Sequence, residues 1–248
     1  MCQIYAGKQT QLVDAFPMES ETEISDTLME FIRKRGAPNL LFSDNAKAVI
    51  GKKVNDILRW YSIRDHQSEP RYQNQNYAER VIQEILRYVQ VCMERTGTPP
   101  DCWLLCLLYV VELMNHIARD SLNGKTPIQA AFNVIPDVSP YLYTFWWQPV
   151  YFKATDKKEF PSQSKEKTGH IVGIAWTKGD LMTFQVLDDE TRYISTRSEV
   201  RPIDIANPNF KAMSDAGEGD FGVSHKPIVQ SMTEATQEFE KDTSDRFS

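Results

Sequence analysis

The chain has 248 residues, of which 41% are hydrophobic and 25% charged, and its formal net charge is −6. This length and hydrophobic content suffice for one sizeable core and a small second module. The net charge argues against a strongly basic nucleic-acid-binding protein, but residues 206–248 alone hold 8 acidic against 4 basic side chains, so the rest is close to neutral.

The cysteines and the apolar stretches indicate an intracellular protein without a membrane span. The four cysteines form no Cys-x-x-Cys pair and lack zinc-ligand spacing, so we expect reduced thiols. The strongly apolar stretch 102–111 is too short to cross a bilayer before Glu112 interrupts it. The first residues lack the basic start and long apolar run of a signal peptide.

The first third of the chain predicts strands and one helix. Residues 3–7 and 11–16 are expected to form two strands joined by a turn at Gly7. Ser20–Glu23 has the pattern of a capping box, which predicts a helix that ends at Gly36 and buries Ile24, Leu28, Phe31 and Ile32. Next come a short buried strand at 40–42, a helix at 54–61 and a strand at 62–64.

The middle of the chain predicts mainly helices. One begins near Asn76 and ends at Gly97, and its buried positions are Ala78, Ile82, Ile85, Val89 and Met93. The most apolar helix should run from 99 to about 118. A second capping box at Thr126, with Pro127 at the first helical position, starts another. Together with the strands before them, these elements predict a mixed α/β domain over residues 1–149.

The composition changes after residue 149. Short alternating or β-branched segments at 150–152, 170–176, 182–187 and 191–196 are separated by turn residues, which is typical of a small all-β module. We place this module at 150–205. Residues 206–248 are rich in polar residues and glycine without periodicity, which predicts a disordered acidic tail.

Two carboxylates carry the chemical hypothesis. Asp44 follows the apolar strand 39–43, and Glu79 opens the helix thirty-five residues later. Phosphoryl transfer by two divalent ions needs several converging carboxylates, and Mg²⁺ prefers such hard oxygen ligands. The alternative is structural, because Asp44 also fits a turn and Glu79 also fits a capping box begun by Asn76.

Three sequence phrases decide between these interpretations, at 41–46, 68–80 and 125–131. In their order and spacing they resemble the integrase of copia-type long-terminal-repeat retrotransposons, and the likeness runs from residue 3 to about 203. The resemblance implies a ribonuclease H-like core over 1–149, a small SH3-like β module, and a metal triad of two aspartates and a glutamate. Asp44 matches the second aspartate and Glu79 the glutamate.

The resemblance also implies an activity, and it shows which parts of the family's pattern are missing from this sequence. The implied reaction is Mg²⁺- or Mn²⁺-dependent 3′-end processing and strand transfer of element DNA into target DNA, in the nucleus, by multimers on DNA. The first aspartate of the triad and the amino-terminal zinc module have no counterpart here, and Asp14 is a poor substitute. We therefore expect a truncated gene model, a degenerate copy or a piece of a polyprotein, without strand-transfer activity as it stands.

Further residues are candidates for nucleic-acid contacts. The helix that begins near Asn76 presents a polar face that includes Gln83, Arg87 and Gln90, and Arg80 flanks it. The preceding phrase adds Arg71, and Tyr72 could stack on a base. Lys47, Lys52 and Lys53 form a second, weaker candidate patch.

Other conspicuous side chains have structural interpretations. The aromatic residues at 141–147 are expected to pack between the core and the β module, and Trp176 is expected in the barrel core. His66 and His116 receive no role. Two functions compete with the integrase: a non-catalytic nucleic-acid-binding remnant of a transposable element, and, with a poorer match, a nuclease acting on RNA–DNA hybrids.

Overall fold

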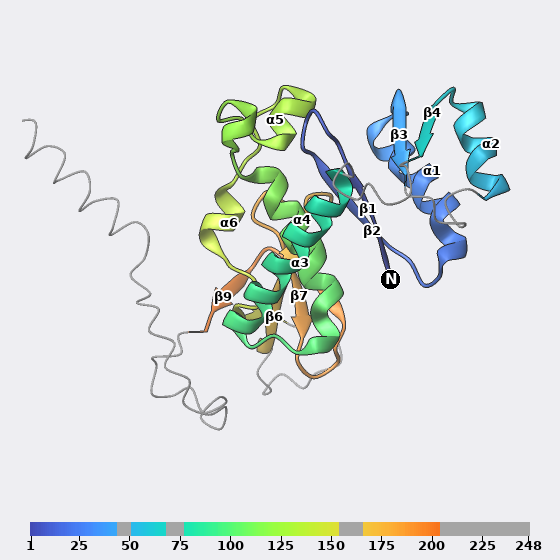
Figure 1. Ribbon diagram of the computed structural model, residues 1–248. Coiled ribbons are helices and arrows are strands. Elements are labelled where there is room, and N and C mark those ends of the chain that lie inside the picture. The colour runs from blue at the N-terminus through green and yellow to red at the C-terminus, as the bar shows by residue number, and fades with distance from the viewer. Residues whose placement is uncertain (44–50, 68–76, 154–165, 204–248) are drawn as a thin grey trace, which may run out of the picture. The chain divides into compact units, whose positions relative to one another are not determined.

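The computed structural model describes residues 1–43, 51–67, 77–153 and 166–203 (Figure 1). Within them the chain forms a mixed α/β architecture with two small two-stranded sheets, several helices and a five-stranded antiparallel sheet. The expected tail at 206–248 lies outside the described residues, as do Asp44 and most of the phrase at 68–80. No helix in the described part is long and apolar enough to span a membrane.

The chain opens with the expected hairpin. Strands β1 (Cys2–Ala6) and β2 (Val13–Pro17) pair antiparallel, and the Gly7 amide closes the turn by donating to the Leu12 carbonyl at 2.8 Å. Successive side chains of a strand point to opposite faces, and both faces of this hairpin are apolar. One face contributes Ile4 and Val13 to one core cluster, and the other contributes Tyr5 and Phe16 to a second.

Helix α1 (Ile24–Arg35) covers the second face of the hairpin. Its buried residues Leu28 and Ile32 follow the expected spacing, and it ends at Gly36, whose φ of 88° favours glycine. The capping box at its start is wrong, because Ser20 makes no capping hydrogen bond with its side chain. Its hydroxyl instead pairs with Thr22, and a short 3-10 turn at Glu21–Glu23 leads into the helix.

Strands β3 (Leu40–Ser43) and β4 (Arg64–Gln67) pair in parallel, joined through helix α2 (Lys52–Trp60). Leu41 packs toward α1 and α2. The expectation that β3 is buried is wrong, because Leu40 is 41% and Phe42 54% exposed. No described element covers their face of this two-stranded sheet. The strand expected at 62–64 begins later, since Ser62 occupies a turn with φ of 53°.

Helices α3 (Tyr77–Thr96) and α4 (Trp103–His116) form an antiparallel pair that covers the first face of the hairpin (Figure 1). Gly97, with φ of 64°, ends α3 as expected. The buried stripe of α3 is rotated slightly from the expected one. Val81, Ile85 and Val89 are fully buried, whereas Ala78 and Ile82 are half-buried.

Two short helices follow, α5 (Pro127–Phe132) and α6 (Ser139–Tyr143). Thr126 caps α5 as expected, because its hydroxyl accepts a hydrogen bond from the Gln129 amide at 3.1 Å. Pro127 stands at the first helical position, where its missing amide hydrogen has no helical partner to lose.

The remaining described residues form one antiparallel sheet with the order β8-β7-β6-β5-β9. Its strands are β5 (Pro149–Lys153), β6 (Glu166–Ile174), β7 (Phe184–Asp188), β8 (Ile194–Arg197) and β9 (Val200–Pro202). The sequence did not indicate β9. Val150, Ile171 and Phe184 form the core of the sheet, while Val172 and Leu187 join the cluster around α3 and α4. The α/β part and the sheet therefore share one core.

Candidate metal and nucleic-acid site

The parallel pair β3–β4 positions the residue after Ser43. Ser43 is the last residue of β3, it stands beside Gln67 in the register, and its hydroxyl donates a long hydrogen bond of 3.4 Å to the Asp65 carboxylate. Asp44 comes directly after this strand end but lies outside the described residues. The carboxyl ends of parallel strands are where α/β sheets place their ligands.

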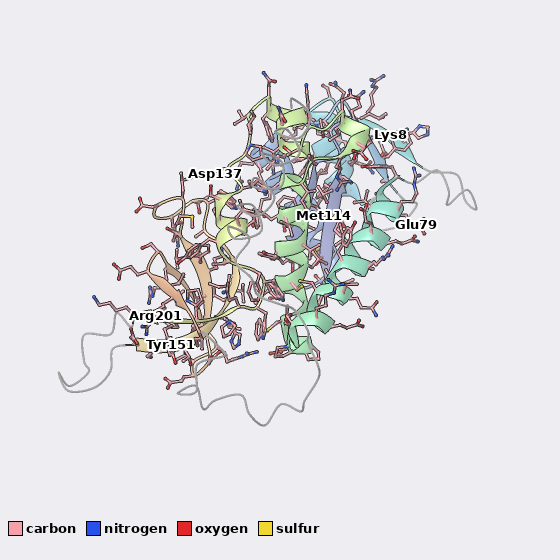
Figure 2. All side chains as sticks on the ribbon, turned by 90° about the vertical axis from the view of Figure 1, so that its left-hand side faces the viewer. Lys8, Glu79, Met114, Asp137, Tyr151 and Arg201 are labelled. Atoms are coloured by element: carbon pink, nitrogen blue, oxygen red, sulfur yellow. The ribbon has the colours of Figure 1, made fainter. Side chains whose placement is uncertain are left out.

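Glu79 lies in the first turn of α3, where it is half-buried (Figure 2). Carboxylates are stabilised in the first turn of a helix by the positive end of the helix dipole. Asn76, the partner required by the structural alternative of a capping box, lies outside the described residues. The structure thus positions Glu79 at the helix entrance and leaves its pairing with Asp44 as a prediction.

The expected nucleic-acid residues fall into two groups. Arg80, Gln83 and Arg87 are described, and all three are exposed on α3. Gln90 shares their face but donates to Glu94 at 2.8 Å, which occupies its amide. Arg71 and Tyr72 lie outside the described residues, as does Lys47. Lys52 and Lys53 are exposed in the first turn of α2.

Asp65 is an acidic residue near the predicted site that sequence reasoning missed. It lies on β4 beside Leu41, is exposed, and contacts Ser43 at the end of β3. The sequence predicts this strand at 62–64, so Asp65 falls just beyond its expected end. In the structure β4 runs from Arg64 to Gln67, which brings Asp65 into the same sheet as the strand before Asp44.

Asp14 has a structural role. It is 3% exposed and accepts two hydrogen bonds of 2.8 Å from Arg35, while Lys34 lies 2.8 Å from it. Burial by itself would raise the pKa of Asp14, but the hydrogen bonds from Arg35 and Lys34 outweigh it and lower the pKa. Two cations already neutralise this carboxylate, so it is unsuited to binding a metal.

Among the aromatic residues at 141–147, Trp146 and Trp147 pack as expected, whereas Tyr143 and Phe145 are 52% and 44% exposed. Trp146 is 2% exposed and its indole donates to the Thr98 hydroxyl at 2.8 Å. Trp147 stacks on His170 of β6 with ring centroids 4.4 Å apart. The placement of Trp176 in a barrel core is wrong, because it is 37% exposed and stacks on His116 instead.

A half-buried glutamate contacts the same tryptophan. The Glu112 carboxylate on α4 accepts a hydrogen bond from the Trp176 indole, and burial raises its pKa to about 7. His116 follows one helical turn later and contacts the Glu112 carbonyl through Nδ1 at 2.8 Å. A lone acidic residue in the most apolar helix could have been recognised from the sequence as unusual. Its contact with Trp176 could not, because the two residues are far apart in the chain.

The described residues alone do not make a metal centre. Within the ranges that the structure describes, no three histidine, cysteine, aspartate or glutamate side chains are grouped so that they could hold a metal ion. All four cysteines are free thiols, as expected. The donor chemistry that fits Mg²⁺ or Mn²⁺ is carboxylate oxygen, and on this part of the fold Glu79 and Asp65 supply it.

Comparisons with known proteins give low similarity. No family model matches the chain, and no curated protein does. Among solved structures, the simian T-cell lymphotropic virus intasome in complex with PP2A regulatory subunit B56 gamma is 16% identical with a TM-score of 0.42, over 82% of this chain and 74% of that one. The HTLV-2 integrase catalytic core domain in complex with magnesium, in its trimeric form, gives 16% and 0.42, over 53% of this chain and 92% of that one. At this level of similarity they assign neither a fold nor an activity.

Proposed function

We propose that this chain is the core of a retrotransposon integrase of the copia type, with a ribonuclease H-like fold, and that it binds DNA in the nucleus. Two observations carry the proposal: the first strand of the parallel pair β3–β4 ends immediately before Asp44, and the first turn of helix α3 holds Glu79. The sequence phrases around both residues support the same assignment.

The proposed chemistry divides between the metal site and the polar face of α3. Asp44 and Glu79 would hold Mg²⁺ or Mn²⁺, which would supply activation of the attacking oxygen and stabilisation of the leaving oxygen. Arg80 and Arg87 bind phosphates next to the carboxylates, and Gln83 reaches a base edge or sugar. Arg71 and Tyr72 extend this contact along the strand.

The sheet geometry favours an additional strand between the two small sheets. The hairpin β1–β2 and the pair β3–β4 are separate sheets, yet Tyr5 and Leu41 belong to the same core cluster under α1. Two-stranded sheets are marginal by themselves, and parallel pairs are normally buried inside larger sheets. A strand between them would join both sheets.

A second candidate is a nucleic-acid-binding remnant without catalysis. Such a remnant would keep the fold and the polar face of α3 but would not hold two metal ions. Both candidates predict DNA binding through α3, and they differ in whether Asp44 and Glu79 bind a metal ion. We expect no strand transfer by the chain of 248 residues with Mg²⁺. Joining that Asp44→Asn abolishes would contradict that expectation.

DNA binding tests what both candidates share. We expect the chain to bind a fluorescent duplex in an anisotropy titration, with an affinity that falls as salt rises. Arg80→Glu and Arg87→Glu should each weaken binding several-fold and reduce the slope of log K against log salt by about 1, because each removes a phosphate contact. Arg33→Glu, an exposed arginine on α1, is the matched control. Equal losses in all three variants would show that α3 is not the contact surface.

A further inference from the structure

Two cysteines meet where helices α3 and α4 pack against each other. Cys92 lies in the second half of α3 and Cys106 in the first turn of α4. Their thiols share a hydrogen bond, and the Cys106 sulfur also lies 4.0 Å from the carbonyl oxygen of Val89, about one turn before Cys92. The two side chains therefore face each other across the helix pair, although fourteen positions separate them in the chain.

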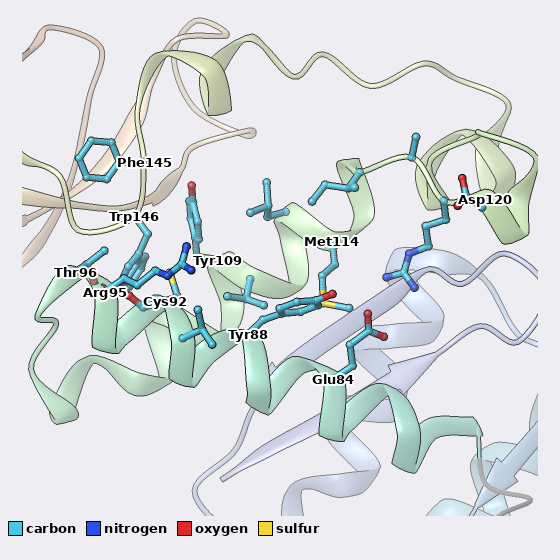
Figure 3. A pocket seen from close by; sticks show the side chains of 16 residues that line it. Glu84, Tyr88, Cys92, Arg95, Thr96, Tyr109, Met114, Asp120, Phe145 and Trp146 are labelled. Carbon is cyan, nitrogen blue, oxygen red and sulfur yellow. Dashed lines mark hydrogen bonds between the residues drawn. The ribbon is translucent and has the colours of Figure 1, made fainter. Parts of the chain in front are cut away.

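The two thiols differ in their exposure. Cys106 is 0% exposed, whereas Cys92 is half-buried and lines an open groove of about 700 Å³ between α3 and α4 (Figure 3). Val110 and Leu113 of α4 give this groove an apolar wall. A small uncharged solute can therefore enter the groove and reach the Cys92 sulfur, whereas Cys106 is closed to solvent.

The hydrogen bond gives the two thiols different chemistry. It lowers the pKa of Cys92, against the opposing effect of burial, and together with burial it raises the pKa of Cys106. Cys106 therefore donates its S–H, and the Cys92 sulfur accepts it. Because the thiolate is the nucleophilic form of cysteine, Cys92 is the thiol suited to attack an oxidant, while Cys106 stays protonated beside it.

Helix geometry allows these two residues to be joined. A helix has a Cα radius of about 2.3 Å, and packed helices lie about 8–10 Å apart, so Cα atoms that face each other come within about 6 Å. Disulfides bridge Cα atoms that are about 4.4–6.8 Å apart. The third cysteine of this region has a different partner, because the Cys102 sulfur accepts a hydrogen bond from Arg192 at 3.6 Å.

We propose that Cys92 and Cys106 are a redox-sensitive pair that a peroxide converts into a disulfide between α3 and α4. In the first step the Cys92 thiolate attacks hydrogen peroxide, so an S–O bond forms, the O–O bond breaks and hydroxide leaves, with Cys92 now a sulfenic acid. In the second step the Cys106 sulfur attacks the Cys92 sulfur, the S–O bond breaks, and the Cys106 proton leaves with the hydroxyl group as water. The two thiols together supply the two electrons that reduce the peroxide.

The disulfide acts as a reversible clamp between the two helices. While it is closed, it fixes the second half of α3 to the start of α4. Disulfides in reducing compartments are mostly transient or redox-sensing, and a thiol reductant such as glutathione returns both cysteines to thiols. The inference does not depend on the proposed function, because neither cysteine belongs to the proposed metal site or to the polar face of α3.

Peroxide treatment of the folded full chain, followed by digestion without reductant, tests the pair. Trypsin separates Cys92, in peptide 88–95, from Cys102 and Cys106, which share peptide 96–119. We expect a cross-link between these peptides that dithiothreitol reverses. Mass-spectrometric fragmentation should assign it to Cys106 over Cys102 by at least about tenfold, because the folded chain holds the thiols of Cys92 and Cys106 in contact. In the urea-unfolded chain this preference should disappear, since both closed loops are then of similar length.

Two variants separate the steps. Cys106→Ala should abolish the cross-link and leave Cys92 as a sulfenic acid that dimedone labels, whereas the matched control Cys102→Ala should keep the cross-link. Because fragmentation assigns the link in the unaltered chain, the test stands even where a variant fails to fold. Absence of the link, a link to Cys102, an equal preference in urea, or a link found only between two chains on a non-reducing gel would overturn the proposal.

Discussion

At the scale of single residues, the acidic side chains divide by their neighbours. Asp14 is buried but held by Arg35 and Lys34, so it serves stability. Glu79 is half-buried in the first turn of α3. Glu112 is half-buried with the indole of Trp176 as its hydrogen-bond donor. Sequence spacing alone could not distinguish these three environments, because each depends on residues distant in the chain.

Glu112 should make stability depend on pH. Burial raises its pKa in the folded state from 4.5 to about 7, so the folded state binds the proton more tightly than the unfolded state. Its contribution is therefore favourable below pH 4.5 and is lost as pH rises to about 7. The shift corresponds to at most about 3 kcal/mol.

Glu112→Gln removes this titration while keeping an oxygen that accepts from Trp176. We expect the variant to exceed the parent in free energy of unfolding at pH 8 by up to about 3 kcal/mol, with no difference near pH 4.5, in urea titrations at each pH. The parent and the variant both retain His116, whose pKa is lowered by burial, so its titration cancels in the comparison. A constant difference at every pH would contradict the assigned environment, and Glu94→Gln is the exposed control.

At the scale of elements, the sequence predicted a helix or strand correctly where the spacing of its apolar residues agreed with the capping or turn residues at its ends. The hairpin, α1 with Gly36, α3 with Gly97 and the cap of α5 at Thr126 all follow from the sequence. The exposure of Phe42 and Trp176 did not. Both residues are apolar in an apolar context, and their exposure depends on which distant element covers them. Strand β9 was missed because three residues carry too little periodicity.

The β6–β7 pair gives a prediction at this scale. A Cβ at Gly169 would lie 2.5 Å from the Leu187 carbonyl oxygen and 2.8 Å from a Val186 methyl, and the backbone of a paired strand cannot move aside. Gly169→Ala should therefore cost about 2 kcal/mol or more of unfolding free energy in urea titrations.

Gly173 in the same strand is the matched control. A Cβ there would meet chiefly the end of the Gln185 side chain, at 2.7 Å, which can rotate away. Gly173→Ala should cost about 1 kcal/mol or less. Equal costs at the two positions would mean that the pairing of β6 with β7 is misplaced.

At the scale of the whole molecule, one hydrophobic core extends from the hairpin through α3 and α4 to Val172 and Leu187 of the five-stranded sheet. The sequence predicted the mixed α/β part and the β segment separately, and their shared core depends on contacts between residues far apart in the chain. The proposed DNA surface and metal site both use α3, the first through its polar face and the second through its first turn.

The central claim is that Asp44 and Glu79 bind the same cation. Manganese broadens nuclear magnetic resonance signals of nearby amides, so a Mn²⁺ titration of the isotopically labelled chain tests it directly. The claim predicts that the amides of Ser43 and Glu79 broaden at the same Mn²⁺ concentration, and that Asp44→Asn and Glu79→Gln each abolish broadening at both places. Broadening at one residue without the other, or broadening at Glu79 that survives Asp44→Asn, would contradict the claim.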